Sequence, residues 1–174
     1  EEIAFALQHE DLAGIFGKLL ENGEVPLRVT HNDTKLNNIM IDLETGKGIC
    51  VVDLDTVMPG LAMNDFGDAI RFGASTALED EKDLSKVSCD MELYEIYVKG
   101  FLESCGDKLN AREIEMLPMG AKVMTYECGI RFLTDYLEGD HYFKIDREDH
   151  NLDRCRTQFK LVADMEQKWR SEER

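Results

Sequence analysis

The chain has 174 residues, of which 43% are hydrophobic and 32% charged, and this composition suits one globular domain with a sizeable core. Its net charge of −16 at pH 7 argues against nucleic acid or an anionic membrane as a partner. The sequence lacks an apolar run of the roughly 18 residues that a transmembrane helix needs, and it begins without a basic, apolar signal peptide.

The first third of the sequence predicts a helix followed by a β-hairpin. Apolar residues at helical spacing predict a helix over residues 1–22, and Gly23 ends it because glycine suits the left-handed position after a helix. Residues 27–30 form the next segment, which we expect to be extended. Two short apolar segments, 38–42 and 49–53, flank a glycine-containing turn, and this pattern is typical of a β-hairpin.

The rest of the sequence has a helical pattern. We expect four helices here, over residues 65–77, 89–104, 111–138 and 148–170. Pro118 is expected in a first turn or at a kink. The acidic segments 79–81 and 146–149 are expected to be solvated helix starts. The last helix carries one apolar stripe, formed by Phe159, Val162, Met165 and Trp169. The predicted fold class is therefore α+β and mainly α-helical.

The cysteines and histidines do not predict a zinc site. The five cysteines are widely spaced and form no C-x-x-C pair, and the four histidines show no ligand spacing. We interpret the thiols as reduced, and this interpretation predicts a cytoplasmic protein.

The residues that carry chemistry lie between His31 and Asp55. Asp33 and Asn38 are five residues apart in a loop that enters the first strand, and Asp53 ends the second strand. Phosphoryl transfer to a hydroxyl requires a carboxylate beside the acceptor and oxygen ligands for Mg²⁺. The hairpin returns the chain so that Asp53 lies alongside Asn38. The alternative is a polar turn in which Asp33 caps local backbone amides.

The pattern H-x-D-x-x-x-x-N, followed by an apolar strand that ends in Asp, resembles the aminoglycoside phosphotransferase and choline kinase superfamily, relatives of protein kinases. The resemblance implies that Asp33 is the catalytic base and that Asn38 and Asp53 are metal ligands. It further implies that Lys35 is directed at the transferred phosphate, that ATP is the co-substrate and that Mg²⁺ is the cofactor. Asp55 binds a second metal ion or the substrate, or is a solvated strand end.

Longer stretches resemble the N-acetylhexosamine 1-kinases, which phosphorylate the anomeric hydroxyl of N-acetylglucosamine or N-acetylgalactosamine with ATP and Mg²⁺. The matching stretches are residues 30–38, 52–60, 65–72, 131–140 and 142–144, and the resemblance spans residues 25–145. It implies that Thr56, Arg131 and Tyr142 bind the sugar. The ordinary alternatives are that Arg131 pairs with a nearby acid and that Tyr142 packs. Asp135, one helical turn after Arg131, either orients that arginine or contacts the sugar.

Two further residues support the loop. We interpret His31 as structural, holding the loop by hydrogen bonds. Asp65, with Phe66 and Gly67, spells the metal motif of protein kinases, but it lies 27 residues after Asn38 and opens a helix. We therefore interpret Asp65 as an N-terminal cap or as a brace for the catalytic loop.

The sequence lacks a nucleotide-covering lobe. It contains neither G-x-G-x-x-G nor a Walker-type loop, and no strand-rich segment precedes the catalytic loop. The chain also opens in mid-pattern, without an initiator methionine. We therefore expect residues 1–174 to be the C-terminal catalytic and substrate-binding lobe of a longer kinase, whose N-terminal lobe is the missing partner. The piece alone is expected to have little or no kinase activity.

The leading hypothesis is the catalytic lobe of an ATP-dependent kinase whose small-molecule partner is a sugar. An aminoglycoside- or choline-type kinase is the alternative within the same chemistry, because an acidic protein suits a cationic acceptor. An alternative of another class is a non-catalytic sugar-binding or interaction domain. The intact Asp33, Asn38 and Asp53 argue against that last alternative.

Overall fold

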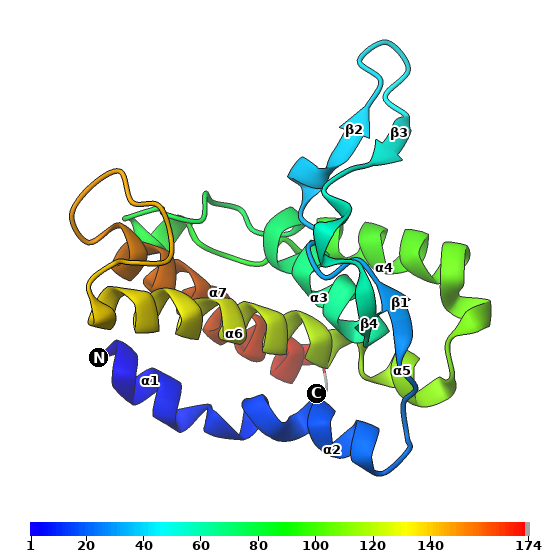
Figure 1. The fold of residues 1–174 in the computed structure, drawn as a ribbon, viewed down its shortest axis with the longest axis horizontal. Helices are drawn as coiled ribbons and strands as arrows, with labels where there is room; N and C mark the ends of the chain where they lie inside the picture. Colours follow the sequence, from blue (N-terminus) through cyan, green and yellow to red (C-terminus); the bar gives the residue numbers. More distant parts are fainter. Residues whose placement is uncertain (173–174) are drawn as a thin grey trace.

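The computed structural model describes the backbone of residues 1–172 and the side chains of residues 1–169. The chain is mostly helical and carries two small antiparallel sheets of two strands each (Figure 1). This architecture confirms the predicted class, α+β and mainly α-helical. Among the described residues, the structure contains no helix that is long and apolar enough to cross a membrane.

The prediction of one helix over residues 1–22 is wrong. The segment is divided into α1 (Glu2–Gln8), a 3₁₀ turn and α2 (Ile15–Glu21). The division follows His9, whose ring nitrogen Nδ1 lies 2.8 Å from the carbonyl oxygen of Phe5 and so satisfies an end group of α1. Gly23 ends α2 with a φ of 71°, as predicted.

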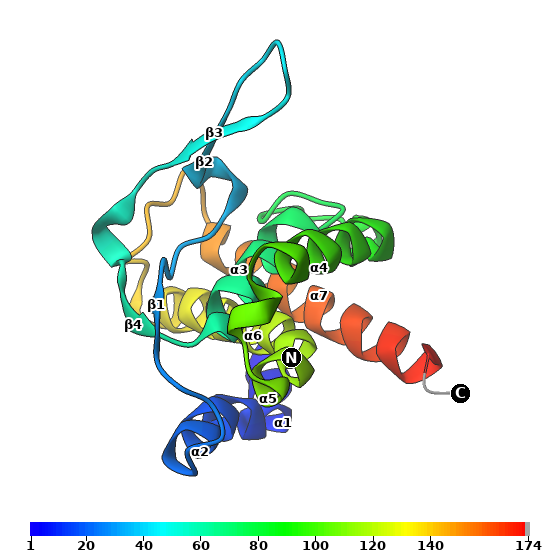
Figure 2. The same cartoon turned by 90° about the vertical axis from the view of Figure 1, so that its right-hand side faces the viewer.

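The predicted hairpin is confirmed, and a second strand pair joins it. Strands β2 (Ile39–Ile41) and β3 (Gly48–Val51) form the hairpin, which projects from the helical body (Figure 2). The predicted extended segment is β1 (Arg28–Thr30), and it pairs antiparallel with β4 (Met58–Gly60). Sequence reasoning missed β4 because Pro-Gly is typical of a turn.

The four predicted helices are present, but one of them is divided. The helices are α3 (Ala62–Gly73), α4 (Met91–Cys105), α5 (Ala111–Glu115), α6 (Leu117–Glu138) and α7 (His150–Glu172). The break in the expected 111–138 helix falls at Met116, and Pro118 lies in the first turn of α6, as predicted. Asn110 and Glu113 form a capping box that fixes the start of α5.

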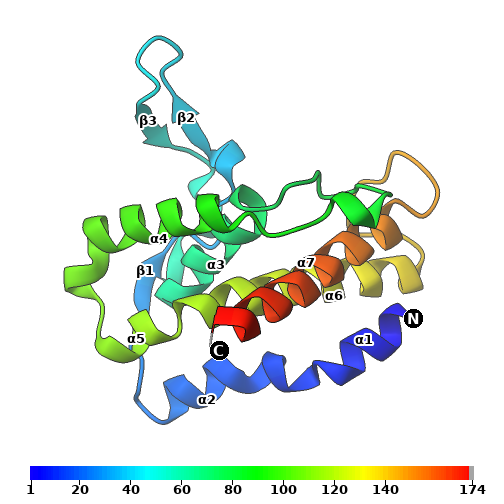
Figure 3. The same cartoon turned by 180° about the vertical axis from the view of Figure 1, so that it is seen from behind.

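Helices α3, α6 and α7 enclose the core, as the view from behind shows (Figure 3). Of the predicted stripe on α7, Phe159, Val162 and Met165 are buried and Trp169 is partly buried. The backbones of α3 and α6 touch, because a Cβ atom on Gly67 would lie only 2.2 Å from the carbonyl oxygen of Gly120. This contact fixes the position of α3 against the rest of the body.

The expectation that residues 79–81 are a solvated helix start is wrong. They form part of a turn in which Glu79 accepts a hydrogen bond from Arg71 at 2.7 Å. In the same turn the Asp80 carboxylate lies 3.1 Å from Nε2 of His150. The structure uses these acids as internal partners of basic groups. The other acidic segment, 146–149, does precede α7 directly.

Candidate active site

The loop that follows β1 is held by a carboxylate in the first turn of α3. Asp65 accepts hydrogen bonds from the backbone N–H groups of His31 and Asn32, at 2.8 and 2.7 Å. Thr34, which the sequence did not single out, donates to the backbone carbonyl of Asp65 at 2.6 Å. Leu61 occupies the N-cap of α3, so Asp65 does not cap the helix. Of the two roles expected for Asp65, the geometry is that of the brace.

Asp33 lies at the centre of this loop. Its Oδ2 accepts hydrogen bonds from Nζ of Lys35 and Nδ2 of Asn38, both at 2.8 Å. Burial works against the charge of this carboxyl, but these donors outweigh burial and lower its pKa, so Asp33 is ionised at neutral pH. Among the described residues, no donor bonds to its Oδ1. The contacts are not those of a turn residue that caps backbone amides.

Asn38 and Asp53 are the predicted metal ligands. Asn38 is 5% exposed, and because its Nδ2 bonds to Asp33, its Oδ1 is left to accept. The N–H of Val52 donates to the carbonyl of Asn38 at 2.9 Å, which joins the two segments at the base of the hairpin. Asp53 itself is exposed, and its carboxylate bonds to no other described residue.

The backbone of Asp53 is left-handed, with φ of 61° and ψ of 59°. A non-glycine residue in this region costs on the order of 1–3 kcal/mol, and such residues cluster at functional sites. The donor set fits Mg²⁺, which prefers carboxylate and amide oxygens and keeps several positions for water and phosphate. Within the described residues no three His, Cys, Asp or Glu side chains form a metal cluster. The pair would therefore be an open site and not a closed cage.

His31 and Thr56 connect the loop to the segment after β3. Nε2 of His31 lies 3.1 Å from the carbonyl of Val52, as expected of a residue that supports the loop. The Thr56 hydroxyl donates to the carbonyl of His31 at 2.6 Å, so the group expected to bind sugar is engaged inside the protein. Asp55 is exposed and its carboxylate bonds to no described residue, which leaves its alternatives open.

Arg131, on α6, and Tyr142, in the loop that follows α6, come together. The Arg131 guanidinium lies 5.7 Å from the centre of the Tyr142 ring and 5.4 Å from that of Phe143. Nε of Arg131 also lies 3.7 Å from Glu127, so the predicted pairing with an acid occurs. Arg131, Tyr142 and Phe143 line a cavity of about 270 Å³. No hydrogen bond or ion pair among the described residues joins these three to the loop of Asp33.

Asp135, which was expected to orient Arg131 or to contact the sugar, is bonded to the loop that follows α6. It is 4% exposed and accepts hydrogen bonds from the backbone N–H groups of residues 141–143, at 2.7–2.9 Å. Nδ2 of Asn151 donates to the same carboxylate at 2.8 Å. Burial opposes the charge, but the three N–H groups lower the pKa of Asp135. The carboxylate therefore holds the loop that carries Tyr142 and makes no bond to Arg131 among the described residues, while Asp135 also lines the cavity beside Arg131.

Residues 2–95, more than half of the chain, match the family model described as the phosphotransferase enzyme family (APH). The matched stretch contains the whole group around Asp33, Asn38 and Asp53 and ends within α4. Arg131 and Tyr142 lie outside it.

Proposed function

Because the chain belongs to the phosphotransferase enzyme family, we propose that it is the catalytic and acceptor-binding lobe of an ATP-dependent kinase that acts on a small-molecule hydroxyl. One observation carries this proposal. An ionised carboxylate, Asp33, is held from one side by Lys35 and Asn38 and keeps one oxygen for another partner. That arrangement suits a group that must orient a hydroxyl and receive its proton.

The chain's own residues divide the chemistry between them. Asp33 orients the acceptor hydroxyl with its Oδ1 and takes the proton as the oxygen attacks the γ-phosphorus of ATP, whose bond to the bridging oxygen breaks so that ADP leaves. Lys35, one-third exposed beside Asp33, is placed to pair with the transferred phosphate. Oδ1 of Asn38 and the carboxylate of Asp53 would hold Mg²⁺. Bound there, the ion supplies positive charge against the phosphate oxygens.

For the acceptor we propose the anomeric hydroxyl of an N-acetylhexosamine. The cavity beside Arg131 and Tyr142 combines an aromatic face with polar groups, which is typical of a site for a neutral, hydroxyl-rich ligand. The cavity wall carries Asp135 and Glu138 beside the Arg131 guanidinium, so a cationic amino alcohol is the competing acceptor that the assay must include.

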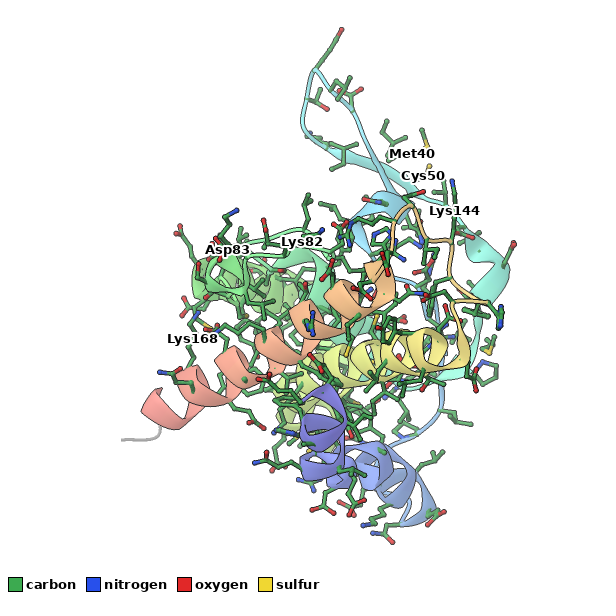
Figure 4. All side chains as sticks on the ribbon, turned by 90° about the vertical axis from the view of Figure 1, so that its left-hand side faces the viewer. Met40, Cys50, Lys82, Asp83, Lys144 and Lys168 are labelled. Atoms are coloured by element: carbon green, nitrogen blue, oxygen red, sulfur yellow. The ribbon has the colours of Figure 1, made fainter. Side chains whose placement is uncertain are left out.

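A further part of the proposal concerns the hairpin. Its apolar side chains are exposed, among them those of the cross-strand pair Met40 and Cys50, which lie next to one another (Figure 4). A contiguous group of exposed apolar side chains, such as the one on this hairpin, marks an interaction site. We assign the N-terminal lobe of a longer polypeptide to this surface, and we expect the 174-residue chain alone to lack kinase activity.

The test is a Mg²⁺-ATP assay of the full-length protein against free N-acetylhexosamines, other sugars, aminoglycosides and choline. Phosphorus NMR of the product distinguishes an anomeric phosphate from other esters. Asp33→Asn is expected to lower kcat on the order of a hundredfold to ten-thousandfold, because it removes the base. Asp11→Asn, at an exposed carboxyl on the 3₁₀ turn, is the matched control and keeps the full rate.

An unchanged rate in Asp33→Asn rejects the catalytic role. Turnover of amino alcohols in place of sugars rejects the acceptor assignment. Sugar-dependent turnover by the 174-residue chain rejects the need for a second lobe.

A further inference from the structure

Two side-chain hydrogen bonds and one close contact of a hydroxyl join the loop of Asp33 to the segment of Asp53, in addition to the hydrogen bond from His31. Nδ2 of Asn32 donates to the carbonyl of Thr56 at 2.9 Å. In return, the Thr56 hydroxyl donates to the carbonyl of His31 at 2.6 Å. The Thr30 hydroxyl lies 3.1 Å from the carbonyl of Met58. The two segments are thus bonded in both directions.

The side-chain amide of Asn32 forms hydrogen bonds through both its nitrogen and its oxygen. Its Nδ2 bonds to Thr56, and its Oδ1 lies 2.9 Å from the hydroxyl of Thr30. Its backbone is left-handed, with a φ of 63°, and its N–H donates to Asp65. Glycine is the least strained residue in that conformation. The backbone alone therefore does not require asparagine, and the amide group contributes the bonds that glycine lacks.

The neighbouring strand leaves space for this group. A Cβ atom on Gly60 would lie 2.8 Å from Oδ1 of Asn32 and 2.2 Å from the hydroxyl oxygen of Thr30. Both atoms belong to the bonded group, and Thr30 is only 3% exposed. A side chain at position 60 would displace them. The close approach of β4 to Thr30 and Asn32 therefore requires glycine at position 60.

We propose that Asn32 is a positioning residue that sets the distance between the carboxylates of Asp33 and Asp53, an inference that rests on the proposed phosphotransfer. Asp33 follows Asn32 directly, and Asp53 lies between Val52 and Thr56, both of which are bonded to the loop. Without the amide, each carboxylate remains, but the bond from the residue before Asp33 to the Asp53 segment is lost and the two segments are held less firmly by the bonds of His31 and Thr56. A misplacement of about 1 Å costs on the order of a hundredfold in rate.

The first experiment compares Asn32→Gly with Asn37→Gly in the full-length protein. Asn32→Gly keeps the left-handed backbone without strain and removes the side chain with its amide. We expect kcat to fall on the order of tenfold to a hundredfold, with the KM of the acceptor within about twofold, because substrate contacts are untouched. Asn37 is an exposed asparagine of the same loop, and its replacement is expected to leave both values unchanged.

A second variant covers the case in which Asn32→Gly does not fold. Asn32→Asp keeps the size and the acceptor for Thr30 but loses the donor to Thr56. It is expected to show the same loss in kcat. The proposal is overturned if the folded variants keep the wild-type kcat, or if Asn37→Gly loses as much as they do.

A second readout does not depend on activity. Mn²⁺ is titrated into the full-length protein, and paramagnetic broadening of the amide signals of Asn38 and Asp53 is followed by NMR. In the wild type both signals are expected to broaden at the same Mn²⁺ concentration, whereas in Asn32→Gly both need a higher concentration because the two ligands are held less firmly together. Identical titrations in both proteins overturn the inference, as does a wild type that Mn²⁺ leaves unchanged.

These outcomes separate the inference from the proposed function. A wild-type protein that phosphorylates no acceptor refutes the proposed function, and the Mn²⁺ titration then decides the role of Asn32 alone. A wild-type kinase whose Asn32→Gly variant keeps its rate refutes only the role of Asn32.

Discussion

Gly67 lets α3 approach α6 to within backbone contact, and replacing it by alanine tests that contact. The new Cβ would lie 2.2 Å from the carbonyl oxygen and 2.4 Å from the carbonyl carbon of Gly120. Ordinary contacts of a Cβ atom begin at 3.4 Å, so the first distance is too short by about 1.2 Å. The obstructing atoms belong to the backbone and cannot rotate away. The two helices must therefore move apart.

The size of the effect follows from two opposing contributions. Overpacking of this kind costs about 1–3 kcal/mol, and the backbone contact places Gly67→Ala in the upper part of that range. Alanine in a helix interior returns about 1 kcal/mol relative to glycine. The net loss in the free energy of unfolding is about 1–2 kcal/mol. For a chain of this length, that lowers Tm by roughly 2–8 °C.

Gly100→Ala is the matched control. Gly100 lies in α4, is exposed, and has no atom within 4 Å of a new Cβ. The same substitution there is expected to raise the free energy of unfolding by about 0.5–1 kcal/mol, because it restricts the unfolded chain. Urea unfolding of both variants, followed by circular dichroism, gives the comparison. If Gly67→Ala is as stable as the wild type, or gains as Gly100→Ala does, the backbones of α3 and α6 do not touch.

Three other outcomes are expected. Asn110→Ala removes the cap of α5 and is expected to cost about 1 kcal/mol in urea unfolding; an unchanged midpoint would contradict the capping role. Burial opposes the charge of Asp164, but hydrogen bonds from Lys168 and from the loop before α4 lower its pKa. The ionised carboxylate therefore stabilises the folded protein above the ordinary aspartate pKa of about 3.9, and this stabilisation is lost as the pH falls below that value. Asp164→Asn should therefore be less stable than the wild type at pH 7, and that difference should shrink below pH 4; a constant difference would refute the assignment. Asp135→Ala is expected to speed hydrogen exchange of the amides at 141–143 on the order of tenfold or more, and unchanged protection of those amides would argue against the bonds described.

Features set by local sequence could be predicted. The hairpin follows from two apolar segments on either side of a glycine turn, and the end of α2 follows from the left-handed Gly23. The pairing of β1 with β4 could not be predicted, because it joins residues 28 and 60, and Pro59 argues against a strand. The break at His9 goes with a bond from its ring to the carbonyl of Phe5, which helical periodicity does not report, and the periodicity does not report the break at Met116 either.

In the candidate site, too, contacts between residues close in sequence could be predicted and contacts between distant residues could not. Asp33, Lys35 and Asn38 lie together because they are within five residues of one another, so their spacing was informative. The function of Asp135 was missed because its partners come from a loop that folds back onto α6. Thr56 was expected at the sugar, yet its hydroxyl bonds to a carbonyl 25 residues earlier in the chain. Only the folded chain reveals such partners.

The projecting hairpin offers a way to observe the candidate site from a distance. Isolated two-stranded hairpins are marginally stable, and β2 and β3 are exposed along their whole length, so their order depends on the bonds at their base. Those bonds run through Asn38, Val52 and His31. A small rotation at the base of the hairpin moves its tip by a larger distance. A spin label at Leu43, which is 98% exposed, would therefore convert sub-ångström changes in the catalytic loop into a measurable displacement.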